Sequence, residues 1–300
     1  MKKLFLTALA VSMALMGRAQ LVEVASIASV ALPQGVTSDM ATVSPDGSYA
    51  VVGQLSGNRL VKVDFATGTT SVITENGNAN GVTISPDGNN IVFRTTTFNK
   101  NHLRYTGLNA VNLTTGKESR LVKPSRHLNA GVAISNEGVT AVENGSARVK
   151  SFTGAKALSM PVASINYGHL DITVNGKTTT LDPQGRGSYL WPSISPDGTQ
   201  VVYCLSGAGT FVCNIDGTNV RRIGNLRAAR WLGNDKVVAM NDKDNGEQIT
   251  SSEIVVSDLA GTHQTITSAD MIALYPSASA DGRIITFSTL EGALYVINLK

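Results

Sequence analysis

The side chains that most often carry catalysis or bind metals are few and scattered in this chain. The four histidines, His102, His127, His169 and His263, form no pair at the spacing of a metal motif, and no Cys/His cluster accompanies them. The sequence also contains no Gly-x-Ser-x-Gly nucleophile elbow, no phosphate-binding loop and no dinucleotide fingerprint. We therefore expect no metal, no cofactor and no catalytic constellation.

One loop concentrates acidic and amide side chains. Residues 241–247 (NDKDNGE) resemble part of a calcium-binding loop, but Lys243 stands where an oxygen ligand would be required. The segment is better interpreted as a solvated hairpin turn between two strands.

The two cysteines lie close together in the sequence, in the segment VVYCLSGAGTFVC. A two-residue turn at Ala208 and Gly209 would place Cys204 opposite Cys213, in a non-hydrogen-bonded pair with a close Cα approach. Such a pair can accept a disulfide, which an oxidising compartment permits. The alternative is two buried free thiols.

The first nineteen residues have the pattern of an export signal. Lys2 and Lys3 precede the apolar run from Leu4 to Met16, and cleavage is expected after Ala19. The apolar run is short for a membrane span, so a transmembrane anchor is the less favoured alternative. We expect a signal peptide at residues 1–19 and one periplasmic or secreted domain at residues 20–300.

Removal of the signal changes the charge of the chain. The full sequence holds 25 Lys and Arg against 22 Asp and Glu, and three of those cations (Lys2, Lys3 and Arg18) leave with the signal. The remaining 22 charges of each sign give no net electrostatic attraction to nucleic acid or to an anionic membrane. Nucleic-acid binding is therefore not expected.

A short turn motif recurs along the chain and sets its organisation. Ser-Pro-Asp-Gly occurs at residues 44–47, 85–88 and 195–198, with weaker copies at 279–282 (SADG), 135–138 (SNEG) and 231–234 (WLGN). Proline fixes φ in the turn, and glycine supplies the positive φ that returns the chain to the next strand. Each copy lies between strand-like stretches, which gives about four strands per repeat.

This pattern predicts an all-β fold, a six-bladed β-propeller. The last repeat ends at its third strand, while residues 22–32 form an unassigned strand before the first repeat. Placing that N-terminal strand outermost in the last blade closes the ring and removes an open edge. Residues 139–182 are too long for one blade and include a hairpin signal at Asn175-Gly176, so seven blades are the alternative.

The order strand, SPDG, strand and LYVINLxTG-like strand resembles the repeats of TolB-type propellers over roughly residues 36–300. The resemblance implies the fold more than the function, since propellers host many activities. The α/β domain that precedes the TolB propeller has no counterpart between the signal and the first repeat.

The side chains expected at the mouth of the propeller channel are aromatic or cationic. Trp191, Arg227 and Tyr275 stand four residues before the signature position of three repeats, where each innermost strand begins. Two long loops, residues 98–107 and 241–250, are expected on the same face. Arg and aromatic side chains offer bidentate donors and flat surfaces to proteins and sugars alike. The expected binding residues are Trp191, Arg227, Tyr275, Tyr189, Arg186 and His127, and the alternative is a solvated channel mouth.

The sequence therefore favours an exported, monomeric, non-catalytic propeller that binds a protein or an envelope polysaccharide. A lyase or glycosidase acting on a saccharide in the central channel is the alternative from another class. Such an enzyme would need convergent carboxylates or histidines in the channel. A purely structural exported protein is a third possibility.

The export signal yields the first prediction. Protein recovered from the exported fraction should begin at Gln20, because small residues precede that position and follow the apolar run. Mass spectrometry of the intact protein measures this directly, and a mass that retains residues 1–19 would contradict it.

Overall fold

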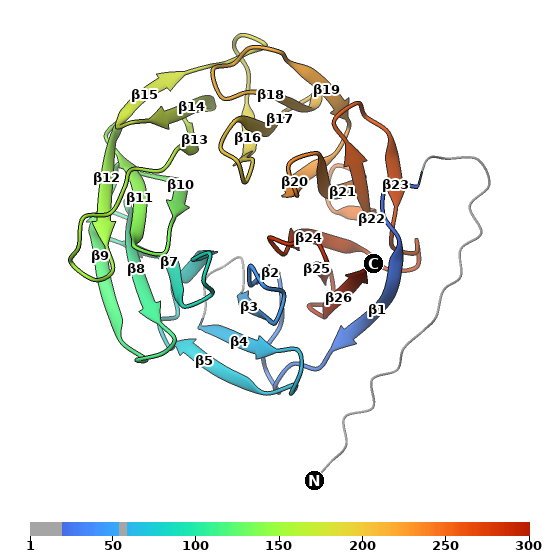
Figure 1. The fold of residues 1–300 in the computed structure, drawn as a ribbon, viewed down its shortest axis with the longest axis horizontal. Coiled ribbons are helices and arrows are strands. Elements are labelled where there is room, and N and C mark those ends of the chain that lie inside the picture. Colours follow the sequence, from blue (N-terminus) through green and yellow to red (C-terminus); the bar gives the residue numbers. More distant parts are fainter. Residues whose placement is uncertain (1–19, 54–58) are drawn as a thin grey trace.

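The computed structural model describes residues 20–53 and 59–300, and the expected signal at residues 1–19 lies outside the described residues. Within that part of the chain there are strands and turns but no helix. Six antiparallel sheets of described residues surround a central channel, so the protein is a six-bladed β-propeller (Figure 1). This fold class confirms the prediction from the repeats.

Five blades have four strands each, ordered from the channel outward. Blade 1 contains β2 (Met40–Val43), β3 (Tyr49–Gly53), β4 (Leu60–Asp64) and β5 (Thr70–Thr74), and blade 2 contains β6 (Ala79–Ile84), β7 (Asn90–Phe98), β8 (Arg104–Asn112) and β9 (Glu118–Ser125). Blade 4 contains β16 (Tyr189–Ile194), β17 (Gln200–Leu205), β18 (Gly209–Asn214) and β19 (Arg221–Gly224). Blade 5 contains β20 (Arg227–Leu232), β21 (Lys236–Asp244), β22 (Ile249–Asp258) and β23 (His263–Thr265). Blade 6 contains β24 (Ala273–Ala278), β25 (Ile284–Thr289), β26 (Leu294–Leu299) and β1 (Val24–Val30).

Blade 3 is a wide sheet that turns back on itself. The strand order in this sheet is β10 (Leu128–Ile134), β11 (Gly138–Glu143), β12 (Ser146–Ser151), β15 (Lys177–Thr180), β14 (His169–Val174) and β13 (Val162–Asn166). Its two halves meet through a single residue pair, Ser146 with Lys177. Both edge strands, β10 and β13, lie side by side at the channel (Figure 1). The long stretch at 139–182 therefore widens blade 3 instead of forming a separate seventh sheet among the described residues.

The hairpin predicted at Asn175-Gly176 joins β14 to β15. Asn175 and Gly176 both have positive φ, 51° and 80°, as the turn of a tight two-residue hairpin requires. Asparagine and glycine tolerate that backbone region better than other residues, so this part of blade 3 was recognisable in the sequence.

The N-terminal strand closes the ring as predicted. β1 pairs antiparallel with β26 along its length, from Val24 opposite Leu299 to Val30 opposite Leu294. The segment before β1 also reaches blade 5, because the Gln264 side chain accepts the N–H groups of Leu21 and Val22 at 2.7 and 3.0 Å. The outer edge of β26 is thereby covered, and the first and last residues of the fold lie together.

The SPDG turns are held by one recurring hydrogen-bond network. In the first copy the Ser44 hydroxyl donates to the Asp46 carboxylate at 2.6 Å and accepts the N–H of Tyr49 at 3.1 Å. The signature serines at 85, 195 and 279 make the same pair of contacts, and all four serines are buried. In the third copy the hydrogen bond from Ser195 helps to hold the pKa of Asp197 below its usual value. The serine therefore fixes the distance between the two strands that the turn joins.

The expected disulfide is wrong, because the hairpin register differs from the predicted one. The turn between β17 and β18 is three residues long, so Cys204 faces Thr210 and Cys213 faces Val201. Residues directly opposite in a sheet share a face, so these two pairs point to opposite faces of blade 4. Cys213 packs in the cluster with Val201 and Tyr203, and both cysteines are free and buried.

Burial makes the two thiols unreactive in the native fold. It raises the pKa of the Cys213 thiol to about 11 and also raises that of Cys204. We expect a chromogenic thiol reagent to react slowly with native protein and to titrate two thiols per chain after denaturation without reductant. A denatured, unreduced sample with no reactive thiol would contradict the observed register.

Ring closure by β1 gives a stability prediction. A chain that starts at Pro33 should lose several kcal/mol relative to one that starts at Gln20, because the edge of β26 is exposed and Ile27 leaves the core between blades 5 and 6. The loss is large against a usual total stability of about 5–15 kcal/mol. Urea unfolding of both chains measures it, and equal midpoints would show that β1 contributes little to closure.

Candidate functional site

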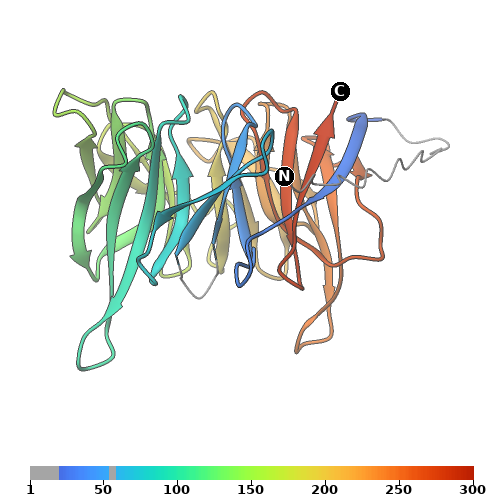
Figure 2. The same ribbon diagram turned by 90° about the horizontal axis from the view of Figure 1, so that it is seen from below.

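Two hairpins project from the same face of the ring, as Figure 2 shows. They are β7–β8, with its tip at residues 99–103, and β21–β22, with its tip at residues 245–248. We call this side of the propeller the hairpin face. The long segments expected there, 98–107 and 241–250, are present, but the strands extend into both of them, so paired backbone replaces much of the expected loop.

The innermost strands carry a bulge at their ends near the hairpin face. Gly81, Trp191, Ala228 and Tyr275 occupy its first position in blades 2, 4, 5 and 6, with φ of 60°, 47°, 50° and 49°. Holding a residue other than glycine in this left-handed backbone region costs about 1 kcal/mol of conformational free energy, whereas glycine adopts the region freely. A bulge also turns its side chain away from the regular alternation of the strand.

Two of the predicted binding residues, Trp191 and Tyr275, are bulge residues. Both are partly buried and pack against the same apolar cluster between blades 5 and 6. The Tyr275 N–H lies 3.2 Å from the Met240 sulfur, which acts as its acceptor. The Trp191 indole N–H has no hydrogen-bond partner among the described residues, so it is free to donate to a ligand.

Arg227 was expected at the position that Trp191 and Tyr275 occupy in their blades, but it lies one residue before that position. In blade 5 the bulge residue is Ala228, and Arg227 pairs with Met240 just before the bulge. The turn after β20 is one residue shorter than an SPDG turn: Trp231 faces Val237, whereas in blade 4 Ile194 faces Val201. The sequence repeats were aligned on the strand that follows the turn. Because this turn is shorter, that alignment misplaced the strand before the turn, β20, by one residue.

The Arg227 guanidinium is engaged by two carboxylates of the neighbouring hairpin. It bonds Asp242 at 2.9 Å and Asp244 at 3.3 Å. The Asp242 side chain is only 1% exposed, and burial raises its pKa despite the adjacent cation. Arg227 thus supplies the counter-charge for a buried acid, which leaves less of its donor capacity for a ligand.

The sequence interpretation missed the role of Asp242 and Asp244 at the mouth. It placed both in an isolated turn, although pairing β20 with β21 brings Asp242 two residues beyond the partner of Arg227. An alignment of the two strands would have revealed the pair, but only with the correct register.

The remaining predicted residues do not join this cluster. Tyr189 is fully buried, its hydroxyl donates to the Gly185 carbonyl at 3.0 Å, and its ring lies 5.5 Å from that of Tyr203. Tyr189 is therefore a core anchor and is not available to a ligand. Arg186 and His127 are exposed in connecting segments, and no hydrogen bond or ion pair between described residues links either one to Trp191, Arg227 or Tyr275.

The hairpin face also exposes apolar side chains that the sequence did not single out. At the β7–β8 tip, Phe98 is 65% exposed and Leu103 is 37% exposed. Tyr167 is 96% exposed in the turn between β13 and β14, which lies beside the start of β16 because the Gly168 carbonyl accepts the Tyr189 N–H at 2.9 Å. The alternation of apolar and polar residues along a strand could not predict the exposure of these side chains, because they lie at strand ends and in turns.

Hydrogen bonds to Asn99 close the β7–β8 tip. The Asn99 carboxamide oxygen accepts the N–H groups of Asn101 and Leu103 at 2.9 and 3.0 Å, and the Asn99 N–H donates to the Leu103 carbonyl at 3.1 Å. The backbone of the tip therefore forms a defined turn, with Phe98 and Leu103 at its two ends.

No group of three or more His, Cys, Asp or Glu side chains lies close enough to hold a metal ion in the described part of the chain. Across residues 20–53 and 59–300 there is also no helix with the length and apolar character to cross a membrane. No protein-family model matches the chain, and no curated protein matches it.

The Arg227–Asp242 pair gives a prediction with a defined sign in pH. Arg227→Met should destabilise the fold by about 1–2 kcal/mol, because it leaves a buried carboxylate without its counter-charge while Arg227 itself is half-exposed. Since the folded pKa of Asp242 lies above its ordinary value, stability falls as pH rises through that folded pKa. The loss should therefore be larger at about pH 7 than at about pH 4.

A double-mutant cycle with Asp242→Asn controls for packing. Adding Asp242→Asn to the Arg227→Met chain should restore part of the stability, because a neutral amide needs no counter-ion. Urea unfolding of the four chains gives the coupling energy, and additive losses would show that the two side chains do not interact.

Proposed function

We propose that this protein is an exported, non-catalytic propeller that binds a partner protein through its hairpin face. The fold is compatible with protein binding, and binding through one end of the channel is a common use of stacked blades. The TolB-like repeats and the signal-like N-terminus support the same assignment, with the protein acting in the periplasm or outside the cell.

The single observation that carries the proposal is the apolar tip of the β7–β8 hairpin. Phe98 and Leu103 expose apolar surface on a turn that Asn99 fixes. Large apolar side chains that project into water on a hairpin are unfavourable there and are typical of interaction sites. Cationic Lys100 and Arg104 flank them, which resembles the polar rim of a protein interface.

The channel mouth adds a second contact region on the same face. Trp191 and Tyr275 have partly exposed rings, and the indole N–H of Trp191 has no partner among the described residues. Aromatic rings with a polar edge are enriched where partners bind. The same groups would suit an envelope polysaccharide, which is therefore a defined alternative outcome of the test below.

The absence of catalysis is part of the proposal, and the chemistry at the mouth supports it. A glycosidase or lyase would need carboxylates free to exchange protons with a substrate. Asp242 and Asp244 are instead committed to Arg227. This arrangement fits a role in which the charges position a strand and do not react.

The test compares apolar substitutions on the two faces. We expect Phe98→Ser with Leu103→Ser to abolish recovery of the partner after cross-linking in the envelope and pull-down. Leu158→Ser is the matched control, because Leu158 is 74% exposed in the connection between β12 and β13, away from the hairpins. The triple variant Trp191→Ala, Arg227→Ala, Tyr275→Ala should weaken the same interaction if the mouth contributes.

Circular dichroism and urea unfolding verify that each variant is folded. Unchanged partner recovery by a folded Phe98→Ser, Leu103→Ser chain would remove the binding site from the hairpin tip. Recovery of polysaccharide alone, with no cross-linked protein, would show that the ligand is the envelope polysaccharide and not a protein.

A further inference from the structure

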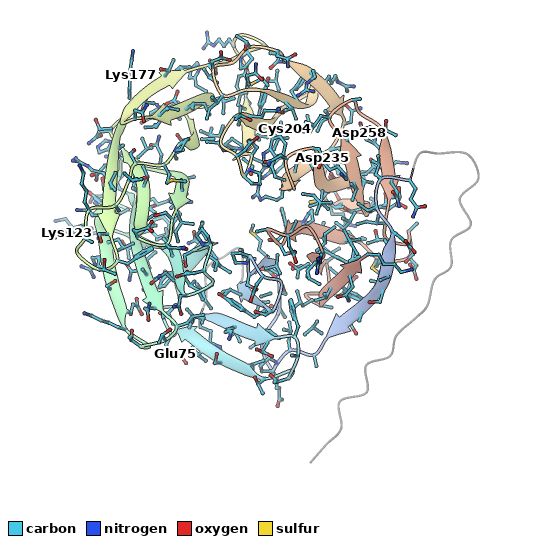
Figure 3. All side chains as sticks on the ribbon, viewed as in Figure 1. Glu75, Lys123, Lys177, Cys204, Asp235 and Asp258 are labelled. Atoms are coloured by element: carbon cyan, nitrogen blue, oxygen red, sulfur yellow. The ribbon has the colours of Figure 1, made fainter. Side chains whose placement is uncertain are left out.

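A groove on the outer rim lies between blade 2 and blade 3. Its volume is about 480 Å³. Its walls are β9 of blade 2 and β11–β12 of blade 3, and its lining residues are Arg120, Leu121, Val122, Lys123, Glu143, Arg148 and Lys150. Figure 3 places Lys123 at the outer rim. The groove is thus reached from the side of the disc and not through the channel.

The groove carries a strong excess of positive charge. Four of its lining residues are cations, and its single acid, Glu143, bonds Arg148 at 3.1 Å. The side chains of Arg120, Lys123 and Lys150 are exposed and make no hydrogen bond or ion pair with any described residue. Three cations therefore line one groove without a counter-ion among the described residues, and an anionic ligand would supply one.

The charge of the groove belongs to a wider asymmetry in the chain. Residues 94–160 hold ten Lys and Arg against three Glu and no Asp, whereas the chain after the signal has equal numbers of both signs. A balanced net charge therefore conceals a basic sector over blade 2 and the first half of blade 3. Such a sector steers an anionic partner towards this rim.

The spacing of the cations fits an extended peptide. Arg148 and Lys150 are two residues apart on β12, and both pair with residues of the apolar cluster that faces blade 2, Ala141 and Val139. Side chains at this spacing on a strand recur about every 6.7 Å. The acidic side chains on one face of an extended peptide recur at the same distance, so each cation can meet one carboxylate.

The outer edge of β12 adds backbone hydrogen-bonding groups. β12 pairs with β15 only at Ser146, and residues 147–151 have no strand on their outer side among the described residues. An unpaired edge accepts an added strand through main-chain hydrogen bonds. A saccharide could use the cations but not this edge.

The geometry points to a second binding site on the rim, in which an acidic, extended segment of a protein pairs with the outer edge of β12. The acidic side chains contact Lys150 and Arg148 from that edge and Lys123 and Arg120 across the groove. The lining of this site shares no residue with the hairpin tip or the channel mouth, so its test is independent of the test of the proposed function.

The experiment measures fluorescence polarisation of a labelled short peptide in which glutamate alternates with threonine. We expect saturable binding that weakens with salt. Lys123→Glu with Lys150→Glu should reduce the affinity at least about tenfold, since two attractions become repulsions. The matched control is Lys243→Glu with Arg283→Glu, which changes the net charge equally at exposed sites on blades 5 and 6 and should alter the affinity less than about twofold.

A second arm tests the backbone pairing. The same peptide methylated on every backbone nitrogen keeps its charge but has no N–H to donate to a strand edge in either direction, and it should lose most of its binding. Equal binding of the methylated peptide, or equal loss in the groove and control variants, would overturn the inference. Tighter binding of polygalacturonate or of single-stranded DNA, lost in the groove variant, would assign the groove to that polyanion instead.

Discussion

The pairing of β1 with β26 is the constraint on which the rest of the ring depends. Each blade of a propeller buries its two faces against the neighbouring blades. The first and last blades can bury both faces only when they pack against each other and close the ring. In this chain the last blade lacks its outer strand until residues 24–30 return to it. The Gln264 side chain adds a second attachment by holding the backbone just before β1. The geometry of the channel mouth is therefore set by a contact at the outer rim.

The sequence predicted the repeated turns well because their chemistry is local. The SPDG motif needs only a serine, an aspartate and a glycine close together, and the Asn175-Gly176 hairpin needs only two residues with positive φ. Ring closure was also predictable, because one strand was missing at one end of the chain and one was spare at the other. Ring closure depends on the number of strands in each blade and not on the exact register between them.

Register decided where the sequence interpretation succeeded and where it failed. A one-residue difference in the turn after β20 moved Arg227 out of the bulge, and a longer turn after β17 placed Cys204 and Cys213 on opposite faces. Tyr189 is buried in a cluster with residues of neighbouring strands, among them Tyr203, and no local pattern encodes those contacts. The ion pair of Arg227 with Asp242 and Asp244 likewise required two strands in their true alignment.

The closing pair also determines how the molecule responds to tension. Because β1 and β26 are antiparallel, Val24 lies opposite Leu299, and the Lys300 N–H bonds the Glu23 carbonyl at 3.0 Å. Both ends of the fold thus leave the same end of the strand pair. A pull between them loads the outermost hydrogen bonds first and peels the strands apart one pair at a time, instead of shearing every pair together. The closing pair of strands should therefore separate under a smaller force than a strand pair of the same length that is pulled from opposite ends.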